Sequence, residues 1–138
     1  MKVFVDTGLW FAYLVRSDQH HHEAAQVMVS LQAEGSLLIT SDLILSETYT
    51  LLMRKLNTKA ALQFLDIIKQ QVEEGFTEII WVNKEILQEA RRLLEKFSDH
   101  SLNLADATSA AILRLNNIPR IATFDRHFKI IMRFSSLP

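Results

Sequence analysis

Four acidic residues of this sequence occur in settings that could bring their carboxylates to one site. Asp6 and Asp125 each follow a short apolar run of β-forming residues. Glu47 and Asp106 lie in segments with helical spacing, and neither has a Lys or Arg three or four residues away. A carboxylate on an apolar helix face is unfavourable unless a cation compensates its charge. The compensating cation must therefore come from elsewhere, either as a basic side chain or as a metal ion.

Carboxylates alone form an oxygen-only ligand set, which Mg²⁺ and Mn²⁺ prefer and zinc does not. We therefore expect the four acids to converge on Mg²⁺ or Mn²⁺. Such an ion can make water nucleophilic and stabilise the leaving oxygen when a phosphodiester is cleaved. This chemistry needs no Cys nucleophile, and the sequence contains no Cys. Each acid taken singly has an ordinary alternative, namely a turn or cap, a distant arginine partner, or an interaction with the helix dipole.

The neighbours of Asp106 in the sequence are small, and include Ala105, Ala107 and Ala110. We expect these alanines to keep the floor of a cleft low enough for a phosphate to approach the carboxylate. Asp99, in the polar segment before this helix, could orient metal-bound water or contact substrate. An ordinary loop position is an equal alternative for Asp99.

The pattern of apolar residues predicts the elements that must position these acids. Apolar runs predict strands over residues 2–5, 37–40, 77–82, 120–123 and, as a short last strand, 129–132. Helical spacing predicts helices over about residues 9–14, 22–34, 42–55, 59–74, 84–97 and 104–117. This alternation is typical of an α/β fold with a mainly parallel sheet of four or five strands and helices on both faces. Ligands of such sheets bind at the carboxyl ends of the strands, where Asp6 and Asp125 are expected.

Length and composition favour one compact domain over residues 1–138, with 49% hydrophobic residues, 3 Gly and 2 Pro. The formal net charge of −1 does not support a general nucleic-acid binder, so a polyanionic substrate would need metal or a local basic patch. Arg126 and Lys129, with Arg114 on the preceding helix, could hold RNA phosphates. A solvated charged surface is the alternative for these three residues.

Targeting and membrane segments are not expected. The sequence contains no run of about 18 apolar residues that could span a bilayer. Asp6 interrupts the apolar run at the N-terminus, so a signal peptide is not expected. Together with the absence of Cys, these features predict a cytoplasmic protein without membrane association.

Several histidines and tryptophans have suitable chemistry but plainer explanations. His20–His22 is a weak metal site, because three consecutive residues cannot readily face one ion. His127 could touch phosphate, although packing or solvation is the expected role. Trp10 and Trp81 are expected in the core rather than as stacking platforms for nucleobases.

Four motifs carry the acids along the chain, namely Val5–Gly8 (VDTG), Ser46–Leu52 (SETYTLL), Leu102–Ala107 (LNLADA) and Ala122–Phe128 (ATFDRHF). In order and spacing they resemble the PIN-domain family, in particular the toxin ribonucleases of VapBC toxin–antitoxin pairs. The resemblance covers essentially the whole chain. It implies a Rossmann-like α/β/α sandwich and metal-dependent endonucleolytic cleavage of RNA.

The resemblance also implies roles for individual acids. Asp6 and Asp106 match the principal metal-binding acids of the family. Glu47 and Asp125 match two further acids, which bind metal directly or through water, or orient the attacking water. Because all four acids are present, we expect an active enzyme.

Further implications of the resemblance concern neighbours and partners. Thr7 and Thr123 match small hydroxyl residues beside the site, and the family implies a homodimer and, for toxins, a cognate antitoxin. The alternatives are a PIN-domain nuclease of RNA processing without an antitoxin, and a non-catalytic PIN-like module for protein interaction. A haloacid-dehalogenase-type phosphatase is disfavoured because Gly8 stands where a second Asp would be needed.

Overall fold

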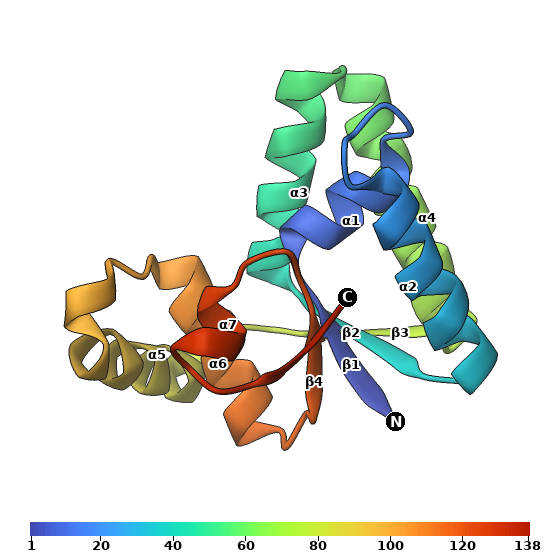
Figure 1. Ribbon diagram of the computed structural model, residues 1–138. Coiled ribbons are helices and arrows are strands. Elements are labelled where there is room, and N and C mark those ends of the chain that lie inside the picture. The colour runs from blue at the N-terminus through green and yellow to red at the C-terminus, as the bar shows by residue number, and fades with distance from the viewer.

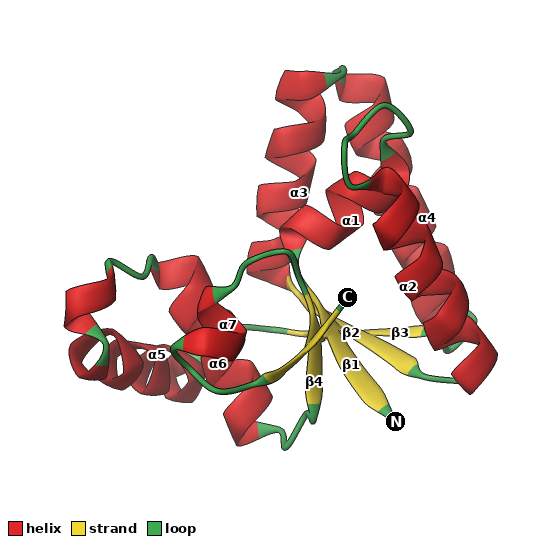
Figure 2. Cartoon of the chain, in the orientation of Figure 1, coloured by secondary structure: helices red, strands yellow, loops and turns green.

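A computed structural model describes all of residues 1–138 as helices on both sides of one parallel sheet (Figures 1 and 2). The strands are β1 (Lys2–Val5), β2 (Leu37–Ser41), β3 (Thr77–Ile80), β4 (Arg120–Ala122) and β5 (Ser135–Leu137). The helices are α1 (Thr7–Leu14), α2 (His21–Glu34), α3 (Asp42–Lys55), α4 (Thr58–Glu73), α5 (Lys84–Lys96), α6 (Leu104–Leu115) and α7 (His127–Ile130), with a 3₁₀ turn at Ser98–His100.

All four strand pairings are parallel, in the order β3-β2-β1-β4-β5. Right-handed crossovers place α1–α4 on one face of this sheet and α5–α7 on the other, as Figure 1 shows. The strand order reverses direction between β1 and β4. In parallel sheets this switch point opens a crevice at the carboxyl ends of the strands. The predicted α/β sandwich is confirmed, with five strands.

The core forms around the central strand and around α6. Val3, Phe4 and Val5 on β1 are fully buried, as expected for a strand covered on both faces. The residues from Ala107 to Leu113 on α6 are also all buried. A helix that is buried on every side is a core helix and not a surface helix.

The burial of α6 corrects the expectation for its alanines. Ala107 and Ala110 are 0% exposed, so they are part of the core and do not form a cleft floor. Their small side chains let α6 pack closely against its neighbours. Of the three alanines around Asp106, only Ala105 is partly exposed.

Two predicted strands were wrong in place or length. Residues 129–132 are not a strand, because α7 occupies His127–Ile130 and the last strand is β5. Phe128 and Met132, four residues apart, are both buried, which is the spacing of a helical turn. A parallel partner for β4 requires such a crossover.

The strand β3 is shorter than predicted and ends at Ile80. The amide of Val82 donates 2.9 Å to Oδ1 of Asp42 instead of to a neighbouring strand. Trp81 is 66% exposed, whereas Trp10 is buried, so the core prediction was correct for Trp10 and wrong for Trp81. None of the helices is both long and apolar enough to cross a membrane.

Candidate active site

Asp6 and Asp125 lie at the switch point of the sheet. Asp6 follows β1 directly, and its amide donates 3.0 Å to the carbonyl of Ala122 at the end of β4. Asp125 follows β4 by three residues. The parallel register of β1 and β4 pairs Val5 with Ala122, so both acids occupy the carboxyl edge of the sheet.

Two short hydrogen bonds hold the carboxylate of Asp6. Its Oδ1 accepts from the amide of Thr7 at 2.9 Å, and its Oδ2 accepts from the hydroxyl of Thr123 at 2.7 Å. Burial raises the pKa of Asp6 to about 6, and repulsion from Asp106 and Glu47 adds to the increase, while the two hydrogen bonds oppose it. Asp6 thus carries a charge at neutral pH that the protein compensates only in part.

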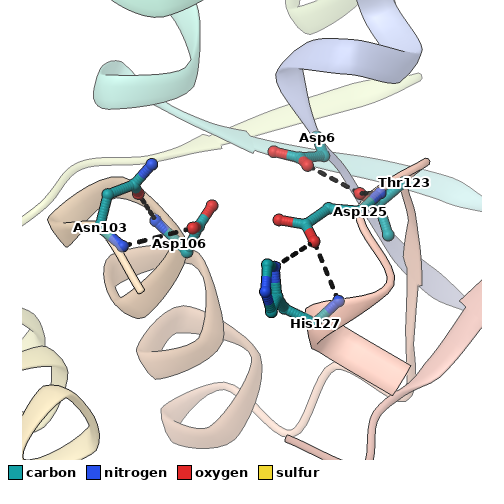
Figure 3. Close-up of polar contacts among 6 residues, drawn as sticks. All are labelled: Asp6, Asn103, Asp106, Thr123, Asp125 and His127. Atoms are coloured by element: carbon teal, nitrogen blue, oxygen red, sulfur yellow. Dashed lines mark hydrogen bonds and ion pairs between the residues drawn. The ribbon is translucent and has the colours of Figure 1, made fainter. Parts of the chain in front are cut away.

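Asp125 is held by its own turn and by His127 (Figure 3). Its amide donates 2.9 Å to the Thr123 hydroxyl, the same hydroxyl that donates to Asp6. Its Oδ1 accepts from the His127 amide at 2.9 Å and lies 2.7 Å from the His127 ring nitrogen Nδ1. Thr123 therefore connects the two strand-end acids through one oxygen atom.

The helix acids approach the same space from α3 and α6. Glu47 lies in the second turn of α3, where its Oε1 accepts from the Thr7 hydroxyl at 3.4 Å. Asp106 lies in the first turn of α6 in a capping box with Asn103, in which the Asn103 side chain accepts from the Asp106 amide at 2.7 Å. The return bond from the Asn103 amide to Oδ2 of Asp106 is long, at 3.5 Å. Both helix acids are thus loosely held.

The four carboxylates influence one another electrostatically. Loss of surrounding water raises the pKa of Glu47, and repulsion from Asp106 adds to the increase. Burial likewise raises the pKa of Asp106, with a further contribution from Asp125. None of the four acids forms an ion pair with Lys or Arg, and the only side-chain nitrogen paired with any of them is Nδ1 of His127, 2.7 Å from Asp125. The structure thus brings the four predicted acids together as a centre of uncompensated negative charge.

The four acids have the ligand chemistry that a divalent cation such as Mg²⁺ or Mn²⁺ prefers. The acids supply only oxygen atoms, as hard cations require, and a cation would relieve the repulsion that raises their pKa values. No three His, Asp or Glu side chains already stand close enough to enclose an ion. Binding would therefore draw the loosely held helix acids toward the strand-end acids.

Two open hollows flank the acids. One lies beside Asp125 and is lined by Phe124, Arg126, Lys129, Ile130, Ser136 and Pro138. The other lies along α3 and is lined by Thr7, Ser46, Glu47, Thr50, Leu51 and Arg54. Each hollow therefore combines an acid of the cluster with at least one cation. Arg54 is seven residues from Glu47, which places both on one helix face, a spacing that could have identified it in the sequence.

Some predicted residues lie away from this centre. Arg114 is near the end of α6 opposite Asp106, about 12 Å along the helix, and its Nε is 3.6 Å from Glu89 on α5. Asp99 is exposed in the 3₁₀ turn and forms none of the hydrogen bonds of the site. The ring of His20 stacks on Phe124 with the ring centroids 4.5 Å apart, so His20 supports the loop before Asp125.

Two known ribonucleases resemble this chain in sequence. The chain is 29% identical over 126 residues to the 23S rRNA-specific endonuclease VapC20 of Mycobacterium tuberculosis, an alignment that covers 91% of each chain. It is 27% identical over 135 residues to a VapC ribonuclease of Archaeoglobus fulgidus, covering 94% of this chain and 81% of the relative.

Solved structures resemble the fold over nearly its full length. The crystal structure of Mycobacterium tuberculosis VapC20, a toxin that cleaves the sarcin–ricin loop, superimposes with a TM-score of 0.81 at 26% identity and covers 99% of each chain. VapBC2 of Rickettsia felis, bound to a promoter DNA fragment, gives a TM-score of 0.70 at 17% identity and covers 99% of this chain and 97% of its own. The family model described as the PIN domain matches residues 3–132. This chain therefore belongs to the PIN-domain family.

Proposed function

We propose that this protein is an endoribonuclease of the VapC type that depends on Mg²⁺ or Mn²⁺. The observation that carries the proposal is the group of four mutually repelling carboxylates at the switch point of the sheet, none of them paired with Lys or Arg. A scaffold for protein interaction has no use for such a group, because it destabilises the fold. The ribonuclease names of its relatives support RNA as the substrate.

The roles proposed for the four acids follow the positions that they match in the PIN-domain family. Asp6 and Asp106 bind the cation directly, while Glu47 and Asp125 bind it directly or through water. A bound divalent cation supplies Lewis-acid activation of water and of the phosphodiester. Thr7 and Thr123 donate hydrogen bonds that stabilise the charged form of Asp6.

Cations beside the acids bind the RNA backbone. Arg126 and Lys129 line the hollow next to Asp125, so they contact phosphates on that side of the cut. Arg54 is the corresponding cation in the hollow next to Glu47. Arg114 is paired with Glu89 at the far end of α6, and its contribution is the smallest of the four. Asp99 contacts the RNA only if the bound RNA chain extends over the start of α6.

In the cell we propose a cytoplasmic toxin that acts as a homodimer and is restrained by a cognate antitoxin. Toxin–antitoxin complexes among its structural neighbours support the antitoxin. A small open reading frame for a DNA-binding protein next to the gene would support the same assignment. Its absence would favour the alternative of a PIN-domain nuclease of RNA processing.

The decisive experiment incubates the purified protein with structured RNAs, including a synthetic sarcin–ricin hairpin, in Mg²⁺, Mn²⁺ or EDTA. We expect cleavage with either cation, and none in EDTA or in Asp6→Ala and Asp106→Ala. Asp66→Asn, an exposed acid on α4, is the matched control and should cleave like the wild type. Equal cleavage in EDTA would refute the metal mechanism. Tight binding of a partner protein with no cleavage of any RNA would favour the interaction module.

A further inference from the structure

One side chain in the cleft has no role in the proposed chemistry. The ring of His127 lies beside the Asp125 carboxylate, below the space between Asp125 and Asp106 in Figure 3, and 46% of its side chain is exposed. Its Nδ1 is 2.7 Å from Oδ1 of Asp125. Because a carboxylate oxygen can only accept, Nδ1 must carry the proton, and it does so whether the ring is neutral or charged.

The two donors of His127 act on the same oxygen atom. The backbone amide of His127 also donates to Oδ1 of Asp125, at 2.9 Å. The other carboxylate oxygen, Oδ2, receives no hydrogen bond from the protein. In Figure 3 this second oxygen points toward Asp106. The negative charge of Asp125 also affects Asp106 directly, which places the two carboxylates across one shared space.

We propose that His127 is a positioning residue that fixes the Asp125 carboxylate through its Nδ1–H, so that Oδ2 faces the space shared with Asp106. Two donors on one oxygen restrict rotation of the carboxylate about its side-chain torsions. The amide bond alone is the ordinary bond of a turn and leaves that rotation freer. The ring therefore adds an orientation that the turn does not provide.

This inference rests on the proposed function, because orientation matters only if Oδ2 meets a cation or its water. Hydrogen bonds to ligand carboxylates tune metal affinity in other proteins. His127 would thus affect cation binding and kcat, but not the affinity of the protein for RNA. An RNA contact from His127 would have the opposite signature, a higher KM at an unchanged kcat.

Three substitutions separate the ring nitrogen from the bulk of the ring. His127→Ala removes the Nδ1 donor and keeps the backbone amide. His127→Asn places an amide NH₂ where Nδ1 was, whereas His127→Gln places it near the position of Nε2. His22→Ala, an exposed histidine on α2, is the matched control. Thermal unfolding in EDTA establishes that each variant is folded.

The first measurement is Mn²⁺ binding by calorimetry without RNA, and the second is cleavage kinetics on the RNA that the wild type cuts. We expect His127→Ala to weaken Mn²⁺ binding and lower kcat by about 10- to 100-fold, with KM changed by less than about twofold. His127→Asn should recover most of both losses, and His127→Gln should not.

Equal values for His127→Ala and His127→Asn would overturn the proposal, as would a higher KM with kcat and Mn²⁺ binding unchanged. A wild type that neither binds Mn²⁺ nor cleaves RNA would refute the proposed function itself. If the wild type binds Mn²⁺ and cleaves RNA, and His127→Ala does so equally well, only the role of His127 would be refuted.

Discussion

The two acids at strand ends and the two acids on helices are held in different ways. Each carboxylate of the first pair, Asp6 and Asp125, accepts two hydrogen bonds of 2.7–2.9 Å. Each carboxylate of the second pair, Glu47 and Asp106, accepts a single contact of 3.4 or 3.5 Å. The strand-end acids are therefore set in place by the fold, while the helix acids are free to adjust.

The contrast between the two pairs explains how a highly charged centre can be compatible with a stable fold. Hydrogen bonds offset part of the cost of the most deeply placed acid, Asp6. The helix acids retain solvent around them and can remain apart until a cation arrives. The strand-end pair thus has a fixed position, and the helix pair would supply adjustable ligands to the proposed cation.

The largest expected effect separates a direct ligand from its neighbour. Asp106→Asn should lower kcat by at least about 1,000-fold, equivalent to about 4 kcal/mol, because the residue proposed as a direct ligand loses its charge. Asp125→Asn keeps an oxygen that can accept from His127 and should lower kcat by only about 10- to 100-fold. Single-turnover kinetics would measure both variants. Equal losses would mean that Asp125 is also a direct ligand.

The next effect concerns stability without metal. The pKa of Asp6 is raised from 3.8 to about 6 in the folded state, so the folded protein binds this proton more tightly than the unfolded chain. The stabilisation from protonation is complete below about pH 4 and is lost as the pH rises through about 6. In EDTA, Asp6→Asn should therefore be more stable than the wild type at pH 7.5, by at most about 3 kcal/mol.

Urea unfolding of both proteins from pH 4 to pH 7.5 would test this prediction. The advantage of Asp6→Asn should disappear near pH 4, and Asp66→Asn should show no such dependence. Mn²⁺ at pH 7.5 should stabilise the wild type and not Asp6→Asn, because only the wild type binds it tightly. A difference that stays constant over the whole pH range would contradict the origin in the charge of Asp6.

A smaller effect compares the two threonines. Thr123→Val removes the 2.7 Å bond to Asp6 and the acceptor of the Asp125 amide, and should lower kcat about tenfold, as expected for the loss of one charged hydrogen bond. Thr7→Val keeps the backbone bond to Asp6 and loses only the 3.4 Å contact with Glu47. Its kcat should change by less than about threefold. Thr123→Ser is the restoring control, and similar losses at both threonines would remove the distinction between the two pairs.

The smallest effect concerns RNA binding beside the strand-end acids. Arg126→Ala and Lys129→Ala should each raise KM about two- to tenfold with little change in kcat, and should reduce the salt dependence of binding. Arg91→Ala is the control, since Arg91 pairs with Glu95 on the exposed face of α5. Titrations at two salt concentrations would measure the effect. An unchanged KM would remove Arg126 and Lys129 from the path of the RNA.

The sequence predicted which acids follow strands and which lie on helices, because these placements depend on residues close by in the chain. The run before Asp6 is apolar because β1 is central in the sheet, and Glu47 lacks a basic neighbour because it faces the other acids. The segment after β4 was mispredicted because its apolar residues suit either a strand or a helix. Only the need for a crossover to β5 decides between them.

The role suggested for His127 could not have been predicted in the same way. Asp125 and His127 are only two residues apart, and the sequence does not indicate that the ring of His127 turns back onto the Asp125 carboxylate. Trp81 illustrates the same limit, because β3 ends at Ile80, the Val82 amide donates to Asp42, and Trp81 between them is exposed. Such long-range contacts leave no periodic pattern in the sequence.

The tight packing of α6 should make activity sensitive to residues that never touch substrate. Ala107, Ala110 and Ala111 are fully enclosed, so a larger side chain there must displace the helix, at about 1–3 kcal/mol. Asp106 lies at the tip of that helix and would move with it. In a growth selection for loss of toxicity, substitutions in these alanine codons should be recovered beside those in the acids. Mutations that abolish toxicity would thus fall both in the buried helix α6 and among the acids of the site.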